Sequence, residues 1–345
     1  SHVNYMELRD HRVAIAKVLE LLADKEVGVL GSINELDAVG HRVVHGGEDF
    51  AASVVINSEV KEAIHKNSAL APLHNPPNLL GIEAVEAALP ELPQVAVFDT
   101  ACHQTMPKKA YLYGLPKAQY EIHKIRRYGF HGTSHKYVAE QTIATLGKPA
   151  AETKIITCHL GNGGSLTAFD GGKSVDTTMG MTPLEGILMG TRSGTMDPYI
   201  PLHLIQSQGL SVSEVNGIMN KEGGLLGLCG RSDMRDLLKA REEGCEDAIV
   251  AFDAFVYRIQ KFVGSYVAAM NGVDAIVFTA GIGENNALIR KAVMDNFKFL
   301  GVEINDAAND ANEVEISTAD SKVKVYVIPT NEELVIAQDT AALIG

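Results

Sequence analysis

The sequence predicts a mixed α/β protein with two domains. Its 345 residues exceed what one hydrophobic core usually supports, so two domains are expected. Short apolar runs typical of buried strands precede segments of helical periodicity in both halves. Hydrophobic residues make up 46% and charged residues 21%, the balance of a globular rather than a disordered chain. The composition changes near residues 100 to 150, where we expect the interdomain region.

The first half begins with a helix. Ile15, Val18 and Leu22 recur at spacings that place them on one helix face. Two prolines directly before residue 78 indicate the start of a later helix. The predicted elements are a helix over 6–23, a strand over 38–44, helices over 57–66 and 78–88, and a buried strand over 95–98.

Two glycine turns open the second half. GNGG at 161–164 and DGG at 170–172 each join short apolar runs, which is typical of an antiparallel meander. Its predicted strands cover 155–160, 165–169 and a run from 173. The remaining predicted elements are helices over 201–206, 211–220, 234–242, 247–270 and 287–297, strands over 275–279 and 323–327, and a closing helix over 331–338.

The charge balance excludes several classes of function. Lys and Arg total 30 against 43 Asp and Glu, and the net charge of −13 repels nucleic acid. A phosphorylated ligand therefore requires local cations, backbone amides or a metal ion. No apolar run reaches the ~20 residues that cross a membrane, and we expect no signal segment. The four cysteines lack zinc or disulfide spacing, which favours free thiols in a cytoplasmic protein.

Two glycine-rich segments follow predicted strands. In HLGNGGS, residues 159–165, glycines let backbone N–H groups approach an oxyanion, although an ordinary hairpin turn explains the same residues. TAGIGENN, residues 279–286, would direct a helix N-terminus at phosphate or ribose oxygens, or simply start a helix. Asn286 stands where a dinucleotide fingerprint requires glycine, so nicotinamide binding is disfavoured.

Two arginines stand in unusual settings. Arg42 lies in the apolar segment GHRVVHGGE, and Arg192 lies among glycines in MGTRSGT. A guanidinium fork matches phosphate or carboxylate oxygens, so either side chain could clamp an anion. A structural ion pair is the alternative for each arginine considered alone.

Two histidines are candidates for the same site. His131 in GFHGTSH precedes a helix whose N-cap we expect at Thr133 or Ser134. An imidazole at this place could donate to developing phosphoryl charge. His74 precedes two prolines on a stiff loop. A purely structural role is the alternative for both, more strongly for His74.

Two carboxylates follow predicted strands. Asp99 ends VAVFD, where open α/β sheets present side chains to ligands, and Glu332 begins the last helix after another strand. Magnesium needs only one or two carboxylates besides nucleotide phosphates and water. A turn carboxylate and a helix-dipole carboxylate are the respective alternatives.

Eight segments occur in the order found in one enzyme family: GHRVVHGGE, APLHNPPN, VFDTACHQTMP, RRYGFHGTSH, HLGNGGS, TPLEGILMGTRSG, TAGIGEN and IPTNEEL. On these segments the chain resembles the acetate kinase family over essentially its whole length. The resemblance implies the fold of the acetate and sugar kinase, heat-shock ATPase and actin superfamily, also called actin-like or ribonuclease H-like. It consists of two related α/β domains with mixed sheets flanked by helices and a cleft between them. The implied acyl-substrate domain covers 1–103 and 334–345, and the nucleotide-binding domain covers 104–333.

The resemblance also implies residue roles. Arg42 and Arg192 would contact the carboxylate and the transferring phosphoryl group, and His131 would stabilise the transition state with His74 nearby. Asp99 and Glu332 would serve the arginines and a Mg²⁺ ion, for which Mn²⁺ could substitute. The implied pocket for the acyl methyl group consists of Val44, Leu73, Phe130 and Pro183. The residues implied to surround ATP or ADP are His159, Leu160, Gly161, Asn162, Gly163, Asp233, Met234, Arg235, Gly281, Ile282, Gly283, Glu284 and Asn285.

The implied reaction is reversible, magnesium-dependent transfer of the γ-phosphoryl group from ATP to acetate by direct in-line displacement, in a homodimer. A carboxylate with a pKa near ~4.3 is already ionised at neutral pH, so the attack needs no general base. One alternative is a propionate or other short-chain acyl kinase, because a methylene alters binding by only ~1–3 kcal/mol. Another is a catalytically impaired nucleotide-binding module.

The sequence departs from the family pattern at two places. Family members begin with a strand and an Asn-x-Gly-Ser-Ser-Ser phosphate loop, and roughly fifty residues that would include them are absent here, which would leave a sheet edge unpaired. We expect the lost phosphate contacts to lower activity. Cys102 replaces the usual Phe, for which we expect a modest packing change.

Overall fold

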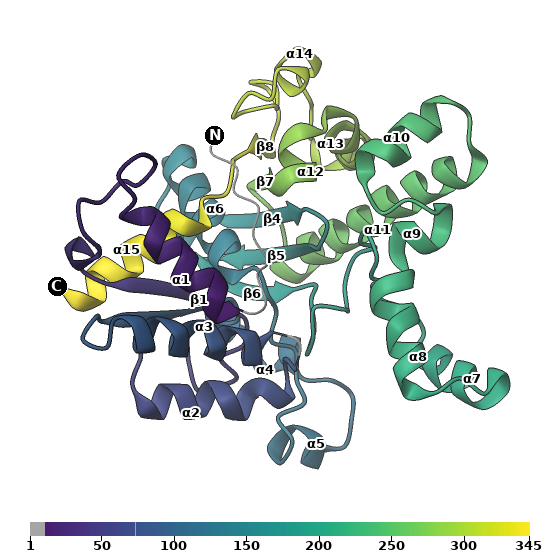
Figure 1. Cartoon of the computed structure of the whole chain (residues 1–345). Coiled ribbons are helices and arrows are strands. Elements are labelled where there is room, and N and C mark those ends of the chain that lie inside the picture. The colour runs from purple at the N-terminus through teal and green to yellow at the C-terminus, as the bar shows by residue number, and fades with distance from the viewer. Residues whose placement is uncertain (1–10, 73) are drawn as a thin grey trace. The chain divides into compact units, whose positions relative to one another are not determined.

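The computed structural model describes residues 11–72 and 74–345, which divide into two compact units. Unit 1 comprises residues 1–104 and 331–345, and unit 2 comprises residues 105–330. Each unit contains one β-sheet with helices packed on it (Figure 1). The predicted mixed α/β class is confirmed, and the first boundary between the units lies within the predicted interdomain range.

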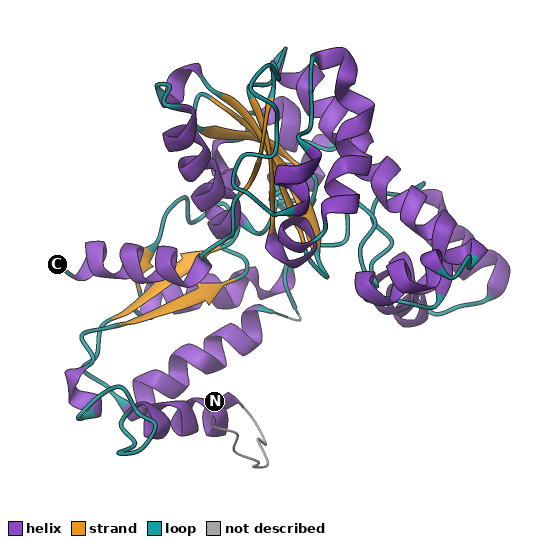
Figure 2. Ribbon diagram, turned by 90° about the horizontal axis from the view of Figure 1, so that it is seen from above, coloured by secondary structure: helices purple, strands orange, loops and turns teal. Residues whose placement is uncertain are grey.

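Unit 1 has a three-stranded sheet in the order β1-β3-β2, with strands β1 (Val39–Val43), β2 (Val54–Val55) and β3 (Gln94–Phe98). Helix α15 (Glu332–Ile344) packs on one face, and α3 (Asn75–Ala88) packs on the other beside α1 (His11–Leu22) and α2 (Ser58–Lys66) (Figure 2). β1 and β3 are parallel, with Arg42 paired to Val97. Because side chains alternate along a strand, this register puts Arg42 on the same face as Asp99.

The start of α3 corrects one prediction. The helix begins at Asn75 rather than at residue 78, with Pro76 and Pro77 inside its first turn. Proline is tolerated there because the first-turn N–H groups have no partner within the helix. The predicted helix over 6–23 is described from residue 11 and ends at Leu22, and its residues 6–10 lie outside the described residues.

Unit 2 has a five-stranded sheet in the order β6-β5-β4-β7-β8. β4 (Lys154–Leu160), β5 (Gly164–Asp170) and β6 (Lys173–Thr177) form the predicted antiparallel meander. β7 (Ala275–Thr279) and β8 (Lys324–Val327) continue the sheet in parallel to β4. Helices cover both faces, with α6 (Gly132–Leu146) against β4 and β7 and α11 (Glu246–Met270) against β4 and β5 (Figure 2). The parallel pairing of β4 and β7 brings His159 and Thr279 to one sheet edge.

Several helices of unit 2 differ from their predicted bounds. α10 (Met234–Glu242) has the predicted bounds, while α7 (Tyr199–Gln208) is longer. α8 (Val212–Gly217) ends early and continues as a π-helical turn over Ile218–Glu222, and α13 (Ala287–Met294) continues as a 3-10 segment over Asp295–Leu300. The unpredicted helices are α4 (Lys108–Tyr111), α5 (Lys117–Glu121), α9 (Gly224–Cys229), α12 (Ala280–Asn285) and α14 (Asp306–Asp310). Each is too short to produce a recognisable periodicity.

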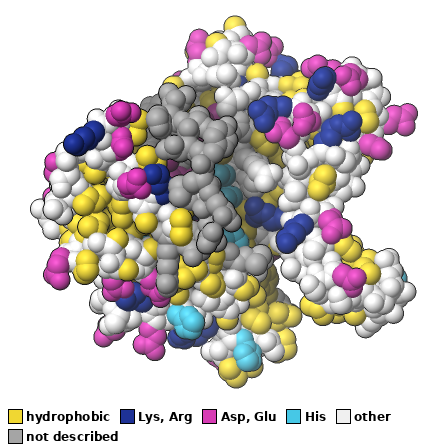
Figure 3. All heavy atoms as spheres, in the orientation of Figure 1, with side chains coloured by type: hydrophobic (Ala, Val, Ile, Leu, Met, Phe, Trp, Pro, Cys, Tyr) yellow, Lys and Arg dark blue, Asp and Glu magenta, His cyan; other side chains and the backbone are white. Residues whose placement is uncertain are grey.

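The surface of unit 2 carries both signs of charge. Acidic side chains are interspersed with basic ones over the part that holds α10 and α14, on the face in view (Figure 3). This mixture agrees with the excess of acidic over basic residues that gives the net charge of −13. Among the described residues, no helix combines the length and hydrophobicity needed to span a membrane.

Candidate active site

Arg42, Asp99 and Glu332 form one charged cluster in unit 1. The buried Asp99 accepts hydrogen bonds from Arg42 Nε (3.0 Å to Oδ1) and Nη2 (2.5 Å to Oδ2). Glu332 Oε2 lies 3.9 Å from Arg42 Nε. The Arg42 side chain remains 47% exposed, so part of its guanidinium stays available to a ligand. The ion pair that was the alternative interpretation is therefore present, and it holds the arginine in a partly open position.

The electrostatics of this cluster are unbalanced. The charge of Asp99 raises the pKa of Arg42. Burial, followed by the negative charge of Asp99, raises the pKa of Glu332, and Arg42 offsets this only in part. Two carboxylates thus face one guanidinium, an arrangement that accommodates an additional cation. Across the described residues, no group of three or more His, Cys, Asp or Glu side chains forms a metal site.

Two asparagines of α3 hold the segment that follows β1. Asn75 Oδ1 accepts from His45 N–H (3.1 Å), and Asn75 Nδ2 donates to His45 O (2.9 Å). Asn78 Oδ1 accepts from Val44 N–H (3.1 Å). Sequence reasoning missed both residues, although the pattern Asn-Pro-Pro-Asn was a usable signal, since asparagine often pairs with backbone. Val44 in this segment is buried and His74 at the helix start is exposed, whereas Leu73 lies outside the described residues.

His131 begins α6 in unit 2 and corrects the predicted cap. The N-cap is His131 itself, with a left-handed φ of 55°, and Thr133 and Ser134 lie within the first turn. Such backbone costs about 1 kcal/mol or more for a non-glycine residue and is concentrated at functional sites. Ser134 Oγ bonds His159 Nδ1 at 2.8 Å instead of capping the helix. The His159 ring stacks on the His131 ring with centroids 4.2 Å apart.

Arg192 lies next to this histidine pair. Its Nη1 donates to Pro183 O at 2.7 Å, and none of the described residues gives its guanidinium a carboxylate partner. Nη2 would be only 2.6 Å from a Cβ built on Gly163, and His131 Cε1 would be 3.7 Å from that same point. Burial lowers the pKa of Arg192. A half-buried cation without a countercharge, beside a glycine turn and an imidazole, is suited to binding an anion.

HLGNGGS is the turn between β4 and β5. Leu160 pairs with Gly164, and Gly161 N–H donates to Gly163 O at 3.0 Å, so the hairpin alternative is confirmed. Asn162 O accepts from Gly190 N–H at 3.1 Å, which ties the turn to the Arg192 loop. The hairpin and a phosphate cradle are compatible, and the cradle remains a prediction.

TAGIGEN differs from the predicted glycine loop, because its glycines lie inside α12. Ala280 makes the sharp turn after β7 with a left-handed φ of 64°. Glu284 Oε1 accepts from Ala280 N–H (2.7 Å) and Thr330 N–H (3.2 Å). A Cβ on Gly281 would meet no atom within 4 Å, so this side of α12 is open. Ile282 is half-buried, Gly283 is buried, and Asn285 is exposed.

Arg290 holds the end of α12 and was missed by sequence reasoning. Its fully buried guanidinium donates to Gly283 O (2.9 Å), Glu284 O (2.8 Å) and Asn309 Oδ1 (2.8 Å). Burial lowers its pKa. The bonds satisfy carbonyl groups that helix ends leave without partners. A cationic side chain in an α-helix gives no sequence signal for this role.

Asp233 and Arg235 pair with each other at the start of α10. Asp233 caps the helix by accepting from Arg235 N–H at 2.8 Å, and it also accepts from Arg235 Nε at 3.0 Å. These bonds lower the pKa of Asp233 to about 2. The Arg235 side chain is 90% exposed, while Met234 between them is buried. The pair is therefore held locally rather than by the core.

The predicted site residues fall into separate local groups. Unit 1 brings together Arg42, Asp99 and Glu332. Unit 2 gathers His131, the turn over 159–163 and Arg192, with Pro183 bonded to Arg192 and Phe130 buried next to His131 in the chain. Gly283 adjoins β4, since its Cβ would lie 3.6 Å from Cys158 O.

Known proteins are similar to this chain over nearly its whole length. The sequence model of the acetokinase family matches residues 1–338. The chain is 56% identical over 337 residues to an acetate kinase of Carboxydothermus hydrogenoformans, covering 97% of this chain and 85% of that protein. It is 54% identical to an acetate kinase of Clostridioides difficile, covering 98% and 85% respectively.

Solved structures give the same result. The chain resembles the crystal structure of an acetate kinase from Porphyromonas gingivalis with a TM-score of 0.95 and 44% identity, covering 99% of this chain and 86% of that one. A propionate kinase from Francisella tularensis follows with a TM-score of 0.93 and 45% identity at the same coverage.

Proposed function

The chain belongs to the acetokinase family, and from that membership we propose that it transfers the γ-phosphoryl group of ATP reversibly to acetate. The products are acetyl phosphate and ADP. The single observation in the structure that carries the proposal is Arg192, whose guanidinium has no carboxylate partner among the described residues and converges with His131 on Gly163. This arrangement offers positive charge and a hydrogen-bond donor to a phosphoryl group without a negatively charged side chain beside it.

The reaction is a direct displacement. A carboxylate oxygen of acetate attacks the γ-phosphorus in line, and the bond to the oxygen that bridges the β- and γ-phosphates breaks. ADP leaves with that electron pair, and no proton moves. Arg192 and His131 bind the equatorial phosphoryl oxygens, while Arg42, oriented by Asp99, aligns the carboxylate. The protein supplies position and electrostatic stabilisation rather than acid or base catalysis.

Asp99 and Glu332 suit a magnesium ion. Both are hard oxygen ligands, and two carboxylates beside the one guanidinium of Arg42 leave negative charge that a divalent cation would neutralise. When bound, the ion supplies charge neutralisation for the nucleotide phosphates. Manganese prefers the same oxygen ligands and could replace it.

We assign the nucleotide to the residues of unit 2. The turn over 159–163, Asp233 to Arg235 and the open side of α12 from Gly281 to Asn285 surround ATP or ADP in this proposal. The residues that we assign to the acyl group are Val44, Leu73, His74, Phe130 and Pro183, together with Arg42. Of the predicted domains, 1–103 with 334–345 for the acyl substrate and 104–333 for the nucleotide, we move the second boundary to 330/331, because α15 packs on the sheet of unit 1.

Trapping acetyl phosphate with hydroxylamine tests the proposal. Incubation with ATP, Mg²⁺ and acetate should give acetyl hydroxamate together with an equal amount of ADP. Arg192→Ala should lower kcat by at least about 1000-fold, the scale seen for arginines that stabilise phosphoryl transfer. Lys117→Ala removes a cation that is 83% exposed and should leave the rate unchanged. Normal turnover by Arg192→Ala would exclude this arginine from the reaction.

Acyl selectivity needs its own measurement, because one structural relative is a propionate kinase. Comparing kcat/KM for acetate, propionate and butyrate separates the two activities. We expect acetate to be preferred, in line with the sequence relatives. A higher kcat/KM for propionate would assign the chain to propionate instead. ATP binding without acyl phosphate formation would indicate the impaired nucleotide-binding module.

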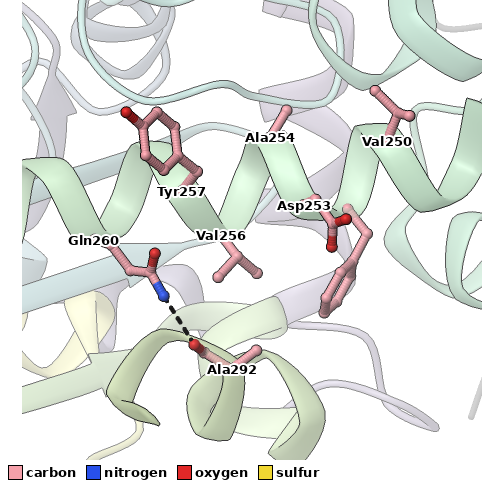
Figure 4. A pocket seen from close by; sticks show the side chains of 8 residues that line it. Val250, Asp253, Ala254, Val256, Tyr257, Gln260 and Ala292 are labelled. Carbon is pink, nitrogen blue, oxygen red and sulfur yellow. Dashed lines mark hydrogen bonds between the residues drawn. The ribbon is translucent and has the colours of Figure 1, made fainter. Parts of the chain in front are cut away.

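We also propose that the chain forms a homodimer and that the outer face of α11 is the interface. The helix buries one face against the sheet and exposes Val250 (60%) and Tyr257 (56%) on the other. These side chains line an open hollow with Ala292 of α13, whose carbonyl accepts from Gln260 Nε2 at 2.9 Å (Figure 4). Sedimentation should give a dimer, and Val250→Asp should increase the monomer fraction. A monomeric wild-type protein would contradict the assignment.

The cytoplasm is the expected compartment. Cys158, Cys229 and Cys245 carry free thiols, which persist in a reducing environment.

A further inference from the structure

We propose that a line of four side chains, Thr157, His135, Ser165 and His131, holds His131 in the tautomer that carries its hydrogen on Nε2. Ser165 is then a positioning residue for His131. The consequence for phosphoryl transfer rests on the proposed function, whereas the tautomer itself does not.

The line runs from β4 through α6 and β5 to the start of α6. Thr157 Oγ1 lies 2.7 Å from His135 Nδ1. His135 Nε2 lies 2.7 Å from Ser165 Oγ, and Ser165 Oγ lies 2.8 Å from His131 Nδ1. Thr157, His135 and Ser165 are fully buried, so bulk water does not compete for the hydrogen bonds among them.

Counting hydrogens leaves two possible directions. Ser165 has one hydroxyl hydrogen but faces two ring nitrogens, so it donates to one and accepts from the other. A neutral His135 likewise carries one ring hydrogen, and a charged His135 would be costly in so buried a place. The three hydrogen bonds of the line must therefore all be donated toward His131 or all be donated away from it.

The position of Thr157 favours donation toward His131. In that direction the hydrogens of Thr157, His135 and Ser165 all have acceptors at 2.7–2.8 Å. In the opposite direction Thr157 has to donate to Thr167 O at 3.5 Å, the limit of a hydrogen bond. A buried hydroxyl hydrogen without a good acceptor is costly, so His131 Nδ1 accepts from Ser165.

Donation from Ser165 to His131 Nδ1 determines whether the other ring nitrogen, Nε2, carries a hydrogen. With Nδ1 occupied as an acceptor, neutral His131 carries its hydrogen on Nε2. The ring is further held by stacking on His159, at 4.2 Å between centroids. His131 then offers a phosphoryl oxygen one oriented N–H donor without having to rearrange during the reaction. The opposite tautomer would present a lone pair to the same oxygen and repel it.

The first test uses the unaltered protein without substrates. Histidine is labelled with ¹⁵N, and the His131 signals are assigned among the 12 histidines by comparison with His131→Gln. At about pH 8, where an ordinary histidine with a pKa of ~6.5 is neutral, we expect a protonated-type Nε2 and an unprotonated-type Nδ1. His135 should give the same pattern. A hydrogen on His131 Nδ1, or on both nitrogens, would overturn the proposal.

The second test removes the shared hydroxyl. In Ser165→Ala the two ¹⁵N signals of His131 should move toward each other, because the ring then exchanges between tautomers. We expect kcat to fall about 10-fold, with KM for acetate and ATP changed less than about twofold. Separated signals that persist in this variant would show that Ser165 does not select the tautomer.

Thr167→Val is the matched control, since Thr167 also lies on β5, is fully buried and loses a hydroxyl bonded to Thr177 Oγ1 at 2.9 Å. It should leave the His131 signals and kcat unchanged. Equal effects of the two variants would reduce the role of Ser165 to general packing. If the unaltered chain forms no acetyl phosphate, the proposed function fails, and the ¹⁵N pattern still decides the tautomer.

Discussion

Replacing Gly163 by alanine should lower the activity of the protein with little effect on its stability. The atom closest to the position of the added Cβ belongs to Arg192. A Cβ at this position would lie 2.6 Å from Arg192 Nη2, and the next atoms, Arg192 Cζ and His131 Cε1, would be at 3.5 and 3.7 Å. Gly163 is not among the residues with positive φ, so alanine meets no backbone penalty. In Gly163→Ala the guanidinium must therefore move while the hairpin stays in place.

The size of the displacement follows from these distances. The methyl group would come about 0.8 Å closer to Nη2 than ordinary contact allows, and a misplacement near 1 Å costs about 100-fold in rate. The free energy of unfolding should change by less than about 1 kcal/mol, because the displaced atom is the end of a flexible side chain.

The assay is acetyl hydroxamate formation at saturating ATP and acetate, with thermal unfolding measured on the same samples. Gly264→Ala is the control, since its Cβ would meet no atom within 4 Å and glycine within a helix gains stability on change to alanine. It should retain full kcat.

Two results would refute the reasoning. Full kcat in Gly163→Ala would mean that Arg192 does not need the position next to Gly163 during turnover. A large drop in the unfolding temperature would mean that the hairpin moved and Arg192 did not.

Three further changes have expected outcomes. Asp99→Asn should lower the free energy of unfolding by about 1–2 kcal/mol in chemical denaturation, which is less than the loss expected for a fully buried ion pair because Arg42 is 47% exposed. The same change should raise KM for acetate. An unchanged KM would mean that Arg42 does not need Asp99 to bind acetate. The pKa of Glu332 is raised in the folded state, so its carboxyl binds protons more tightly there than in the unfolded chain, and its contribution to stability falls as pH rises above about 4.5. Glu332→Gln should consequently gain stability relative to wild type between pH 4.5 and 7, and a constant difference across denaturation curves at these pH values would contradict the shift. Arg290→Met should lower the free energy of unfolding by about 3 kcal/mol and weaken ATP binding, because the Gly283 and Glu284 carbonyls lose their hydrogen-bond donors. Unchanged ATP affinity in calorimetry would mean that α12 is not part of the nucleotide site.

The sequence predicted the elements whose patterns are long enough to recognise. The meander over β4 to β6 was predicted because Asn-Gly and Gly-Gly turns have few uses other than hairpins. α10 and β7 have the predicted bounds, since a capping Asp233 and a continuous apolar run mark them clearly. α12 was missed because six residues with two glycines carry no helical periodicity.

Helix starts were the weaker predictions at the candidate site. The prolines after Asn75 were interpreted as preceding a helix, whereas they occupy its first turn. His131 was placed ahead of a Thr or Ser cap, yet the ring itself lies at the cap, and Ser134 bonds His159. A Ser or Thr hydroxyl has several possible partners, and the tertiary contact with β4 decided which one it took.

The sequence by itself determined the α/β class, the family and the residue types of the candidate site, because motif order and hydrophobic pattern are local properties of the chain. Only the tertiary structure decided how those residues are held. The register of β1 on β3 joins Arg42 to Asp99 over 57 positions of sequence, and Ser165 meets two histidines of another element. Such contacts depend on strand register and burial, which arise only when the whole unit packs.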